Sequence, residues 1–156
     1  MKVAFAVRAG ERADREFVRD LGRRTVNSSV SAARVADADD AIVAFERLAD
    51  FVFERRHEAL IAEEGGARIG FLLLVFDIPD EVTLARQAFV AYTAVEPRAQ
   101  GRGAGRSLMA AAEERARNAG LPCVSLMVSE DNVPARRLYE ALGYATERRL
   151  LTKSLC

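Results

Sequence analysis

The sequence predicts a single domain of mixed α/β fold. Three observations support this prediction. Short apolar runs with strand-like composition alternate with longer segments whose apolar residues recur at helical spacing. Gly65-Gly66 stands between two of the short runs, and glycine tolerates the positive φ angles of a tight hairpin turn. A continuous apolar run over 123–128 follows an Ala-rich segment and is typical of a strand buried on both faces.

The composition limits the classes of protein to which the chain can belong. Half of its 156 residues are apolar, and 23 Lys and Arg balance 23 Asp and Glu, as in a soluble globular protein. The zero net charge gives no support for a nucleic-acid partner. No apolar run approaches the roughly 18 residues of a membrane span, and Arg8 and Arg12 come too early for a signal-peptide core. We therefore expect a cytoplasmic protein without a membrane or nucleic-acid partner.

Cysteine content gives no sign of a disulfide scaffold. Cys123 and Cys156 are the only two cysteines. Two unclustered cysteines form neither a disulfide framework nor a metal-binding set, so no metal is expected. A single disulfide between them stays open at this point.

The first half of the chain is predicted to contain one strand and two helices. Residues 2–8 alternate loosely between apolar and polar side chains, which is typical of a strand. Apolar residues at helical spacing predict amphipathic helices from about residue 12 to 26 and from about 39 to 55. The aspartates within 37–40 are N-cap candidates for the second helix.

The second half is predicted to continue with a hairpin and then with alternating helices and strands. The order over the whole chain is β, α, α, β, β, β, α, β, α, β, in one domain over residues 1–156. A glycine-rich loop opens the third helix, and Gly120 ends it. The other expected elements are strands over 59–63, 68–76, 89–95 and 123–128, a helix over 133–142 and a closing strand over 145–153.

The loop Gln100-Gly101-Arg102-Gly103-Ala104-Gly105-Arg106 is the most informative stretch. It lies between a predicted strand and a predicted helix, where the first backbone N–H groups of the helix have no intrahelical partner. Glycines let the backbone approach an anion closely, and the helix dipole favours negative charge there. Arg98, Arg102 and Arg106 can add side-chain charge. The loop therefore favours a pyrophosphate ligand, and a glycine-rich turn without a ligand is the alternative.

Two common phosphate-binding motifs do not fit this loop. No Lys-Ser or Lys-Thr follows the glycines, which excludes the P-loop pattern. Arg106 occupies the third glycine position of GxGxxG, which excludes the dinucleotide fingerprint.

The spacing of Gln100, Gly103 and Gly105 resembles the coenzyme A loop of the GCN5-related N-acetyltransferases. The family pattern is Gln or Arg, two residues, Gly, any residue, then Gly or Ala. The resemblance implies an acyl-CoA N-acyltransferase fold, in which helices flank a central, mixed and mostly antiparallel sheet. It also implies acetyl-CoA as co-substrate. It implies that the amides of residues 101–106 hold the pyrophosphate, and that backbone around Val95 pairs with the pantetheine arm.

A second motif follows about 30 residues later, from Asn132 to Tyr144. Asn132, Ala135 and Tyr139 lie at i, i+3 and i+7, along one face of a predicted helix. Taken singly, Asn132 is an ordinary N-cap and Tyr139 a half-buried packing residue. Together, Asn-x-x-Ala-x-x-x-Tyr-Glu-x-Leu-Gly-Tyr resembles the second acyl-CoA motif of the same family, at the family's usual separation. The resemblance then covers residues 1 to about 153.

The resemblance also implies roles for three residues of the second motif. Asn132 would bond the pantetheine amide, Ala135 would permit close approach of the cofactor, and Tyr139 would lie near the thioester sulfur. Acyl transfer needs a neutral amine, a donor to the carbonyl oxygen and a proton for the departing thiolate. We expect Tyr139 to act as the general acid and the N–H near Val95 to serve as the carbonyl donor.

The general base is not determined by the sequence. Some family members carry a Glu early on the fourth strand, where this chain has apolar residues 88–90. Glu96 and Tyr92 are candidates, the first as a direct base and the second as a holder of water, and a water chain is also open. His57, the only histidine, is read as a surface residue with a catalytic role as the alternative. Acidic residues in the turn over 77–81 can attract a cation or simply be solvated.

The resulting functional hypothesis is transfer of the acetyl group of acetyl-CoA to a primary amine, either a small molecule or a peptide N-terminus. The alternative is a non-catalytic acyl-CoA-binding domain on the same fold. A domain that binds ATP through the glycine loop is a third reading, which the missing Lys and missing acidic metal ligands disfavour. The family commonly dimerises, so a homodimer is open as well.

Overall fold

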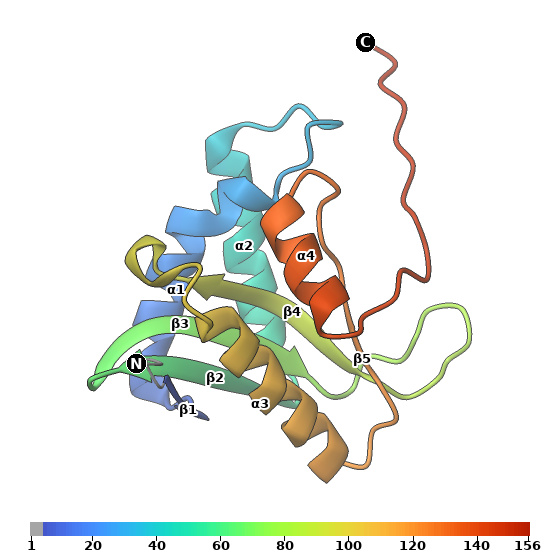
Figure 1. The fold of residues 1–156 in the computed structure, drawn as a ribbon. Helices are drawn as coiled ribbons and strands as arrows, with labels where there is room; N and C mark the ends of the chain where they lie inside the picture. Colours follow the sequence, from blue (N-terminus) through green and yellow to red (C-terminus); the bar gives the residue numbers. More distant parts are fainter. Residues whose placement is uncertain (1–4) are drawn as a thin grey trace.

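The computed structural model describes residues 5–156 and contains a sheet in the order β1-β2-β3-β4-β5 (Figure 1). The first three pairings are antiparallel and the last, between β4 and β5, is parallel. The prediction of a mixed, mostly antiparallel sheet is therefore confirmed. Of the strand expected over 2–8, residues 2–4 lie outside the described residues. The strands are β1 Ala6–Ala9, β2 His57–Glu64, β3 Ala67–Val75, β4 Ala88–Val95 and β5 Val124–Leu126.

Helices cover both faces of this sheet (Figure 1). One buried cluster joins α1 and α2 to one face, and another joins α3 and α4 to the opposite face. Because both faces are covered, β3 is buried along most of its length. The helices are α1 Arg15–Thr25, α2 Ala38–Phe53, α3 Ala104–Asn118 and α4 Val133–Ala141, with short 3-10 turns η1 Arg12–Asp14, η2 Val26–Ser29 and η3 Pro97–Ala99.

The hairpin between β2 and β3 forms at the predicted dipeptide. Gly65 and Gly66 have φ angles of 56° and 80°, in the left-handed region that side chains disfavour. The turn fixes the register of β2 against β3, and β3 in turn becomes the template for β4.

A β-bulge interrupts β4 at Ala91. Leu73 pairs with Tyr92 and Leu74 with Val90, so Ala91 has no partner in the ladder with β3. A bulge bends its strand and increases the local twist. The bend lies where β4 begins to separate from β5, which makes it part of the geometry of the site described below.

The fifth strand is shorter and less buried than predicted. The apolar run 123–128 forms hydrogen-bonded strand only over Val124–Leu126, and all three residues are half-buried rather than buried. Met127 is 82% exposed. The expectation of burial on both faces is wrong because β5 is an edge strand with a single neighbour, β4, among residues 5–156.

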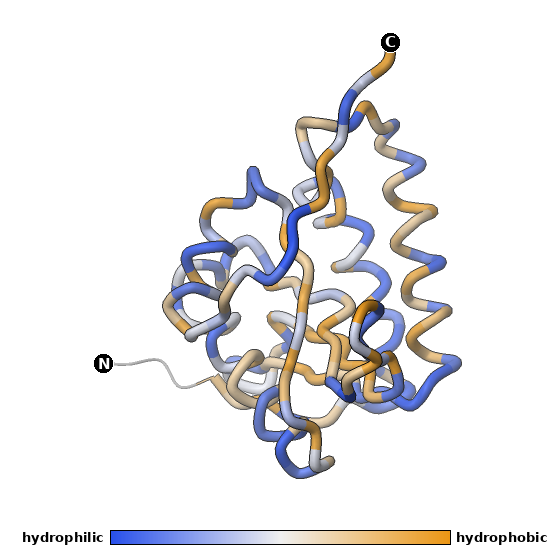
Figure 2. The backbone as a smooth tube through the Cα atoms, turned by 90° about the vertical axis from the view of Figure 1, so that its right-hand side faces the viewer, coloured by the Kyte–Doolittle hydropathy of each residue, from blue (hydrophilic) through white to orange (hydrophobic). Residues whose placement is uncertain are grey.

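The closing strand expected over 145–153 is absent. Residues 145–156 have no regular secondary structure and are exposed throughout, and they extend away from the sheet in Figures 1 and 2. Arg148 binds Asp80 and Arg34 donates to Thr152, so the segment contacts the β3–β4 loop and the segment after α1 instead of a strand. Among residues 5–156 no strand pairs with it, and without a partner edge no strand forms.

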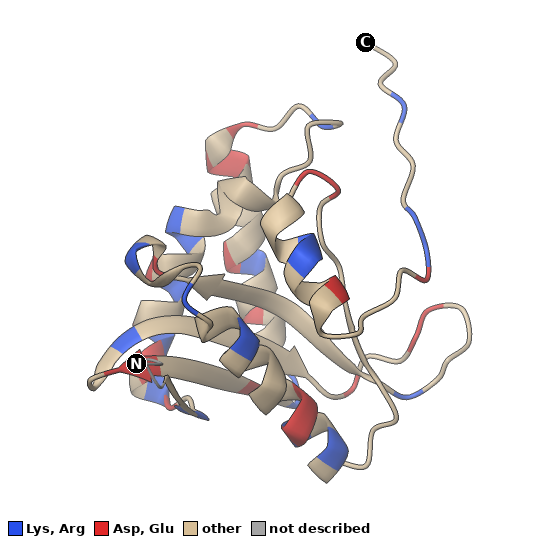
Figure 3. Ribbon diagram, viewed as in Figure 1, with Lys and Arg blue, Asp and Glu red and all other residues tan. Residues whose placement is uncertain are grey.

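Charged residues of both signs are interspersed over the fold (Figure 3). Many form ion pairs between elements, such as Arg19 of α1 with Asp50 of α2 at 2.6 Å. None of the helices in the described range 5–156 has the length and apolar character needed to cross a membrane.

Candidate functional site

The sheet opens between β4 and β5. The two strands pair over three residues only, from Ala88 opposite Val124 to Val90 opposite Leu126. Beyond this point β4 continues to Val95, and among residues 5–156 no strand pairs with it on the β5 side, while β3 still pairs with its other edge. We call the opening beside this free backbone edge of β4, over 91–95, the slot.

Backbone direction shows which groups of β4 face the slot. The N–H of Glu96 donates to the carbonyl of Ile69 on β3 at 2.7 Å. Successive residues of a strand point their backbone groups to opposite sides, so Val95 and Thr93 present theirs to the slot. The side-chain NH₂ group of Gln100 donates to the carbonyl of Val95 at 3.1 Å, which ties the glycine loop to this edge.

The N-terminus of α3 lies at the end of this slot wall. Gly103 is the N-cap, with φ of 100°, and no described side chain caps the helix. The first helical hydrogen bond runs from Ser107 N–H to the carbonyl of Gly103 at 3.0 Å, so the amides of residues 103–106 have no partner within the helix. Free amides at the positive end of a helix dipole form a site for an anion.

The three loop arginines are not equivalent. Arg102 forms an ion pair with Glu64 at 2.5 Å, and its guanidinium lies 5.7 Å from the ring centre of Phe5. Its charge is therefore largely matched within the protein. Arg98 and Arg106 are exposed beside the same helix end.

Asn132 caps α4 in the manner of an ordinary N-cap. Its side-chain oxygen accepts from the N–H of Ala135 at 3.3 Å. The oxygen is used by the helix, whereas the side-chain NH₂ group of an asparagine carries two donors that this contact does not use. Ala135 is half-buried on the first turn of the helix.

The structure brings the two predicted motifs together. A Cβ atom placed on Gly105 of α3 would lie 3.3 Å from Cδ2 of Leu138 on α4. The absence of a side chain at Gly105 thus allows the two helices to approach closely. Val95, Tyr139 and Leu138 all join the buried cluster on this face of the sheet.

Tyr139 is nearly enclosed in that cluster. It is 9% exposed, and its ring packs edge-on against Tyr144 at 5.9 Å between centroids. Burial raises the pKa of Tyr139, because a phenolate would lose its hydration. The pKa of Tyr144 is also raised, by burial and by the carboxylate of Glu113, which accepts from its hydroxyl at 3.1 Å. Both phenols are therefore protonated at neutral pH.

Tyr92 and Glu96 lie on the opposite face of β4, against α1. Both oxygens of Glu96 bind the guanidinium of Arg24, at 2.7 and 3.0 Å. This pairing lowers the pKa of Glu96, which makes the carboxylate a weaker base. The hydroxyl of Tyr92 lies 3.0 Å from that of Thr25, and its ring packs against Phe45.

Arg24 and Thr25 were not predicted to lie at the site. Both stand in the last turn of α1, at ordinary amphipathic positions. The contact between the segment after α1 and the residues between β5 and α4 was not predicted either. The hydroxyl of Ser129 donates to the carbonyl of Ser29, and the N–H of Ala32 donates to the carboxylate of Asp131 at 2.8 Å.

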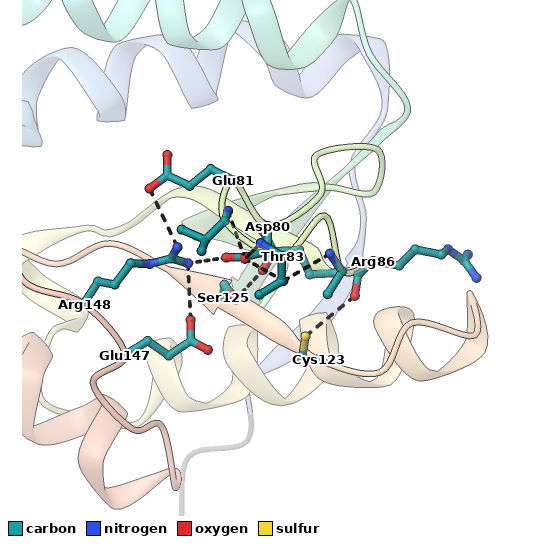
Figure 4. A network of polar contacts seen from close by, with 11 residues as sticks. Asp80, Glu81, Thr83, Arg86, Cys123, Ser125, Glu147 and Arg148 are labelled. Atoms are coloured by element: carbon teal, nitrogen blue, oxygen red, sulfur yellow. Dashed lines mark hydrogen bonds and ion pairs between the residues drawn. The ribbon is translucent and has the colours of Figure 1, made fainter.

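Other residues that the sequence singled out are elsewhere. The Nδ1 atom of His57 lies 2.8 Å from the carbonyl of Arg55, at the start of β2. Asp80 binds Arg148 of the C-terminal segment, as Figure 4 shows. The described residues 5–156 contain no cluster of three or more His, Cys, Asp and Glu.

Comparison with known proteins defines the family. Residues 25–144, more than half of the 156-residue chain, match the model of the Acetyltransferase (GNAT) family. The chain belongs to this family. Among solved structures, a putative acetyl transferase from Pyrococcus furiosus superposes with a TM-score of 0.82 and 25% identity, over 97% of this chain and 100% of that one.

Two curated relatives are similar over part of their length. The mycothiol acetyltransferase of Thermomonospora curvata is 42% identical over 84 residues, which is 54% of this chain and 26% of that protein. The uncharacterized N-acetyltransferase YhfO of Bacillus subtilis is 39% identical over 90 residues, or 56% of this chain and 60% of that one. The matched region thus spans less than two thirds of either relative.

Proposed function

We propose that this protein transfers the acetyl group of acetyl-CoA to a primary amine. The observation that carries the proposal is the slot between β4 and β5, which ends at the uncapped N-terminus of α3. An extended chain with amide groups fits a free strand edge, and a pyrophosphate fits free helix amides. Acetyl-CoA combines these two parts in one molecule.

We assign the binding roles as follows. The amides of Gly101, Arg102, Gly103, Ala104, Gly105 and Arg106 hold the pyrophosphate, with Arg98 and Arg106 adding charge. The backbone of Val95 and the side-chain NH₂ of Asn132 bind the pantetheine amides, and Gln100 releases the Val95 carbonyl that it now occupies. Ala135 leaves room beside the arm because its side chain is a single methyl group.

The chemical step is attack of a neutral amine nitrogen on the thioester carbonyl carbon. A C–N bond forms, the C–S bond breaks, and the sulfur leaves with its electron pair. The amide of Val95, which faces the slot, donates to the carbonyl oxygen as charge develops on it. Tyr139 gives its proton to the departing sulfur, a role that suits a phenol kept neutral by burial.

The amine loses its proton to water rather than to Glu96 in this scheme. Glu96 is engaged by Arg24 through both oxygens, and its lowered pKa disfavours proton uptake. Tyr92 lies on the same face and can hold the water that accepts the proton. We place the acceptor on this α1 side of β4, because α3 and α4 cover the other side.

The engagement of Glu96 also favours a second candidate, a domain that binds acyl-CoA without turning it over. The two functions differ in one measurement. Titration calorimetry with CoA tests the binding site, and release of free thiol from acetyl-CoA with a panel of small amines and peptides tests transfer. Binding with amine-dependent thiol release is expected. CoA binding without thiol release on any acceptor favours the second candidate, and absence of CoA binding contradicts both candidate functions.

A further inference from the structure

The end of α4 brings a second phenol against Tyr139. The N–H of Tyr144 donates to the carbonyl of Tyr139 at 3.0 Å. One residue earlier, the N–H of Gly143 donates to the carbonyl of Glu140, also at 3.0 Å. Many helices end with this pair of hydrogen bonds, and the two side chains that it brings together are often in contact. Here the contact is the edge-on packing of the Tyr144 ring against the Tyr139 ring, so the backbone fixes where one phenol lies relative to the other.

The hydroxyl of Tyr144 links this end of α4 to α3. It donates to the carboxylate of Glu113 at 3.1 Å. Glu113 is half-buried on α3, and its other oxygen lies 3.4 Å from the guanidinium of Arg117, whose side chain is 71% exposed. Nearer the start of α3, Gly105 lies against Leu138 of α4. The two helices are therefore held together at two levels, which are about two helical turns apart along α3.

The chain beyond Tyr144 adds no support at this place. Residues 145–156 are exposed and have no regular secondary structure. Within residues 5–156, Tyr144 is the last residue that packs against the buried cluster on this face of the sheet. Tyr139 lies in the last turn of α4, and helix ends fray readily. The position of the Tyr139 ring therefore depends on the contacts that hold this end of the helix.

The two phenols differ in whether their hydroxyl hydrogen is committed. The hydrogen of Tyr144 lies in its bond to Glu113. Burial raises the pKa of Tyr139, whereas burial, the charge of Glu113 and the hydrogen bond to Glu113 together raise the pKa of Tyr144. A carboxylate beside a phenol disfavours loss of the phenol's proton. Tyr144 is therefore suited to hold a ring in place, and Tyr139 is suited to give a proton.

We propose that Glu113 and Tyr144 are positioning residues, which hold the Tyr139 ring in the orientation that brings its hydroxyl to the thioester sulfur. This role rests on the proposed function, in which Tyr139 is the general acid. Glu113 fixes the hydroxyl of Tyr144, and Tyr144 fixes the ring of Tyr139. The helix that offers its free amides to the pyrophosphate thus also sets the position of the acid. Proton transfer needs a heavy-atom distance of about 2.6 to 3.2 Å, so a small shift of the ring lowers the rate.

Steady-state kinetics of acetyl transfer by the whole chain test this role. Tyr144→Phe keeps the ring and removes the hydrogen bond to Glu113, and it is expected to lower kcat about fivefold at an unchanged KM for acetyl-CoA. Glu113→Ala is expected to do the same. Glu113→Gln, whose amide oxygen can still accept, is expected to keep at least about half of the wild-type kcat. Arg117→Ala is the matched control with an unchanged kcat, because it removes the other contact of Glu113 and leaves the bond to Tyr144.

The same substitution in the Tyr139→Phe background separates positioning from a general effect on the fold. Because Tyr144 acts through the hydroxyl of Tyr139, Tyr144→Phe is expected to lower kcat no further once that hydroxyl is gone. A residue that only stabilises the fold would lower kcat by the same factor in both backgrounds. An equal loss in both backgrounds, or a wild-type kcat for Tyr144→Phe, overturns the proposal.

Nuclear magnetic resonance distinguishes a failure of this role from a failure of the proposed function. The chain has three tyrosines, so isotope labelling of tyrosine rings gives three sets of signals that Tyr→Phe variants can assign. Glu113→Ala is expected to shift the ring signals of both Tyr139 and Tyr144, and Arg117→Ala is expected to shift neither. Unshifted Tyr139 signals in Glu113→Ala overturn the positioning role, whatever the activity. Shifted signals in a protein that transfers no acetyl group contradict the proposed function and leave the hold of Glu113 and Tyr144 on Tyr139 standing.

Discussion

The N-termini of α3 and α4 differ in whether a side chain caps the helix. At α4 the side chain of Asn132 accepts from the N–H of Ala135, so the helix satisfies its own first turn. At α3 the N-cap is Gly103, which has no side chain to offer, and the following amides stay free. The start of α2 resembles that of α4, because Asp37 accepts from Asp39 N–H at 2.8 Å. The start of α1 also lacks a side-chain cap, but a short 3-10 turn leads into it and its N-cap residue is the acidic Asp14. The start of α3 has neither a side-chain cap nor an acidic residue in its first turn, which indicates a place reserved for a ligand.

The largest expected effect comes from placing a negative charge at the free helix start. Gly103→Glu is expected to weaken CoA binding about 100-fold, through repulsion of the pyrophosphate and competition for the amides. Gly103→Ala is the matched control, because it carries the same positive-φ strain without the charge. Calorimetry on both folded variants checks the difference. Equal dissociation constants would remove charge from the explanation.

At the start of α1 the protein itself supplies a negative charge, and this helix start can be compared with the start of α3. Asp14 is the N-cap residue, almost fully buried, and binds Arg8 and Arg68 at 2.8 Å each. Its hydrogen bonds with Arg8 lower the pKa of Asp14 to about 2 against the opposing effect of burial. The stability that this carboxylate adds is present above its unfolded pKa of about 3.9, and it is lost as the pH falls through 2.

Asp14→Asn is accordingly expected to cost about 2 kcal/mol in the free energy of unfolding at pH 7. Urea unfolding at several pH values measures this cost. The difference from wild type is expected to shrink between about pH 4 and pH 2, and CoA binding at neutral pH is expected to stay unchanged. A constant difference over that range would show that the pairing contributes no charge-dependent stability.

Tyr139 lies on α4, the helix that Asn132 caps. Tyr139→Phe keeps the ring that packs against Tyr144 and removes only the hydroxyl. Turnover is expected to fall on the order of tenfold while the affinity for CoA holds, because a thiolate leaves without much assistance. Steady-state rates across pH check this, with thermal unfolding as the control for packing. Wild-type rates at every pH would exclude Tyr139 from the chemistry.

The smallest expected effects distinguish the capping role of Asn132 from a direct contact between Asn132 and CoA. Asn132→Ala and Asp37→Ala are each expected to lower the unfolding free energy by about 1 kcal/mol, because each removes one N-cap. Only Asn132→Ala is expected to weaken CoA binding as well, by a few-fold. Equal CoA affinity in the two variants would restrict Asn132 to its capping role.

Features that depend on local sequence could be predicted. The turn at Gly65-Gly66 and the loop before α3 follow from the backbone freedom of glycine, and both appear where expected. The proximity of the two motifs followed from their resemblance to one family and became a contact, Gly105 against Leu138.

Features that depend on distant partners could not be predicted. Arg24 and Glu96 are 72 positions apart, and nothing in either neighbourhood indicates the other. The bulge at Ala91 arises from the match between β3 and β4 rather than from a glycine or proline in β4. The C-terminal segment 145–153 was expected to be a strand, but nothing within it shows whether a strand edge lies within reach, because that is a property of the assembled fold.

The hydroxyl pair of Thr25 and Tyr92 restricts what can approach β4 from the α1 side. A threonine hydroxyl has a single hydrogen, and that of Thr25 is directed to the carbonyl of Leu21 at 2.8 Å. The hydrogen between the two hydroxyls must then come from Tyr92. With its hydrogen committed, the phenol oxygen can only accept. A group that docks against it must therefore bring a hydrogen of its own, as an amine or a water does and a carbonyl oxygen does not.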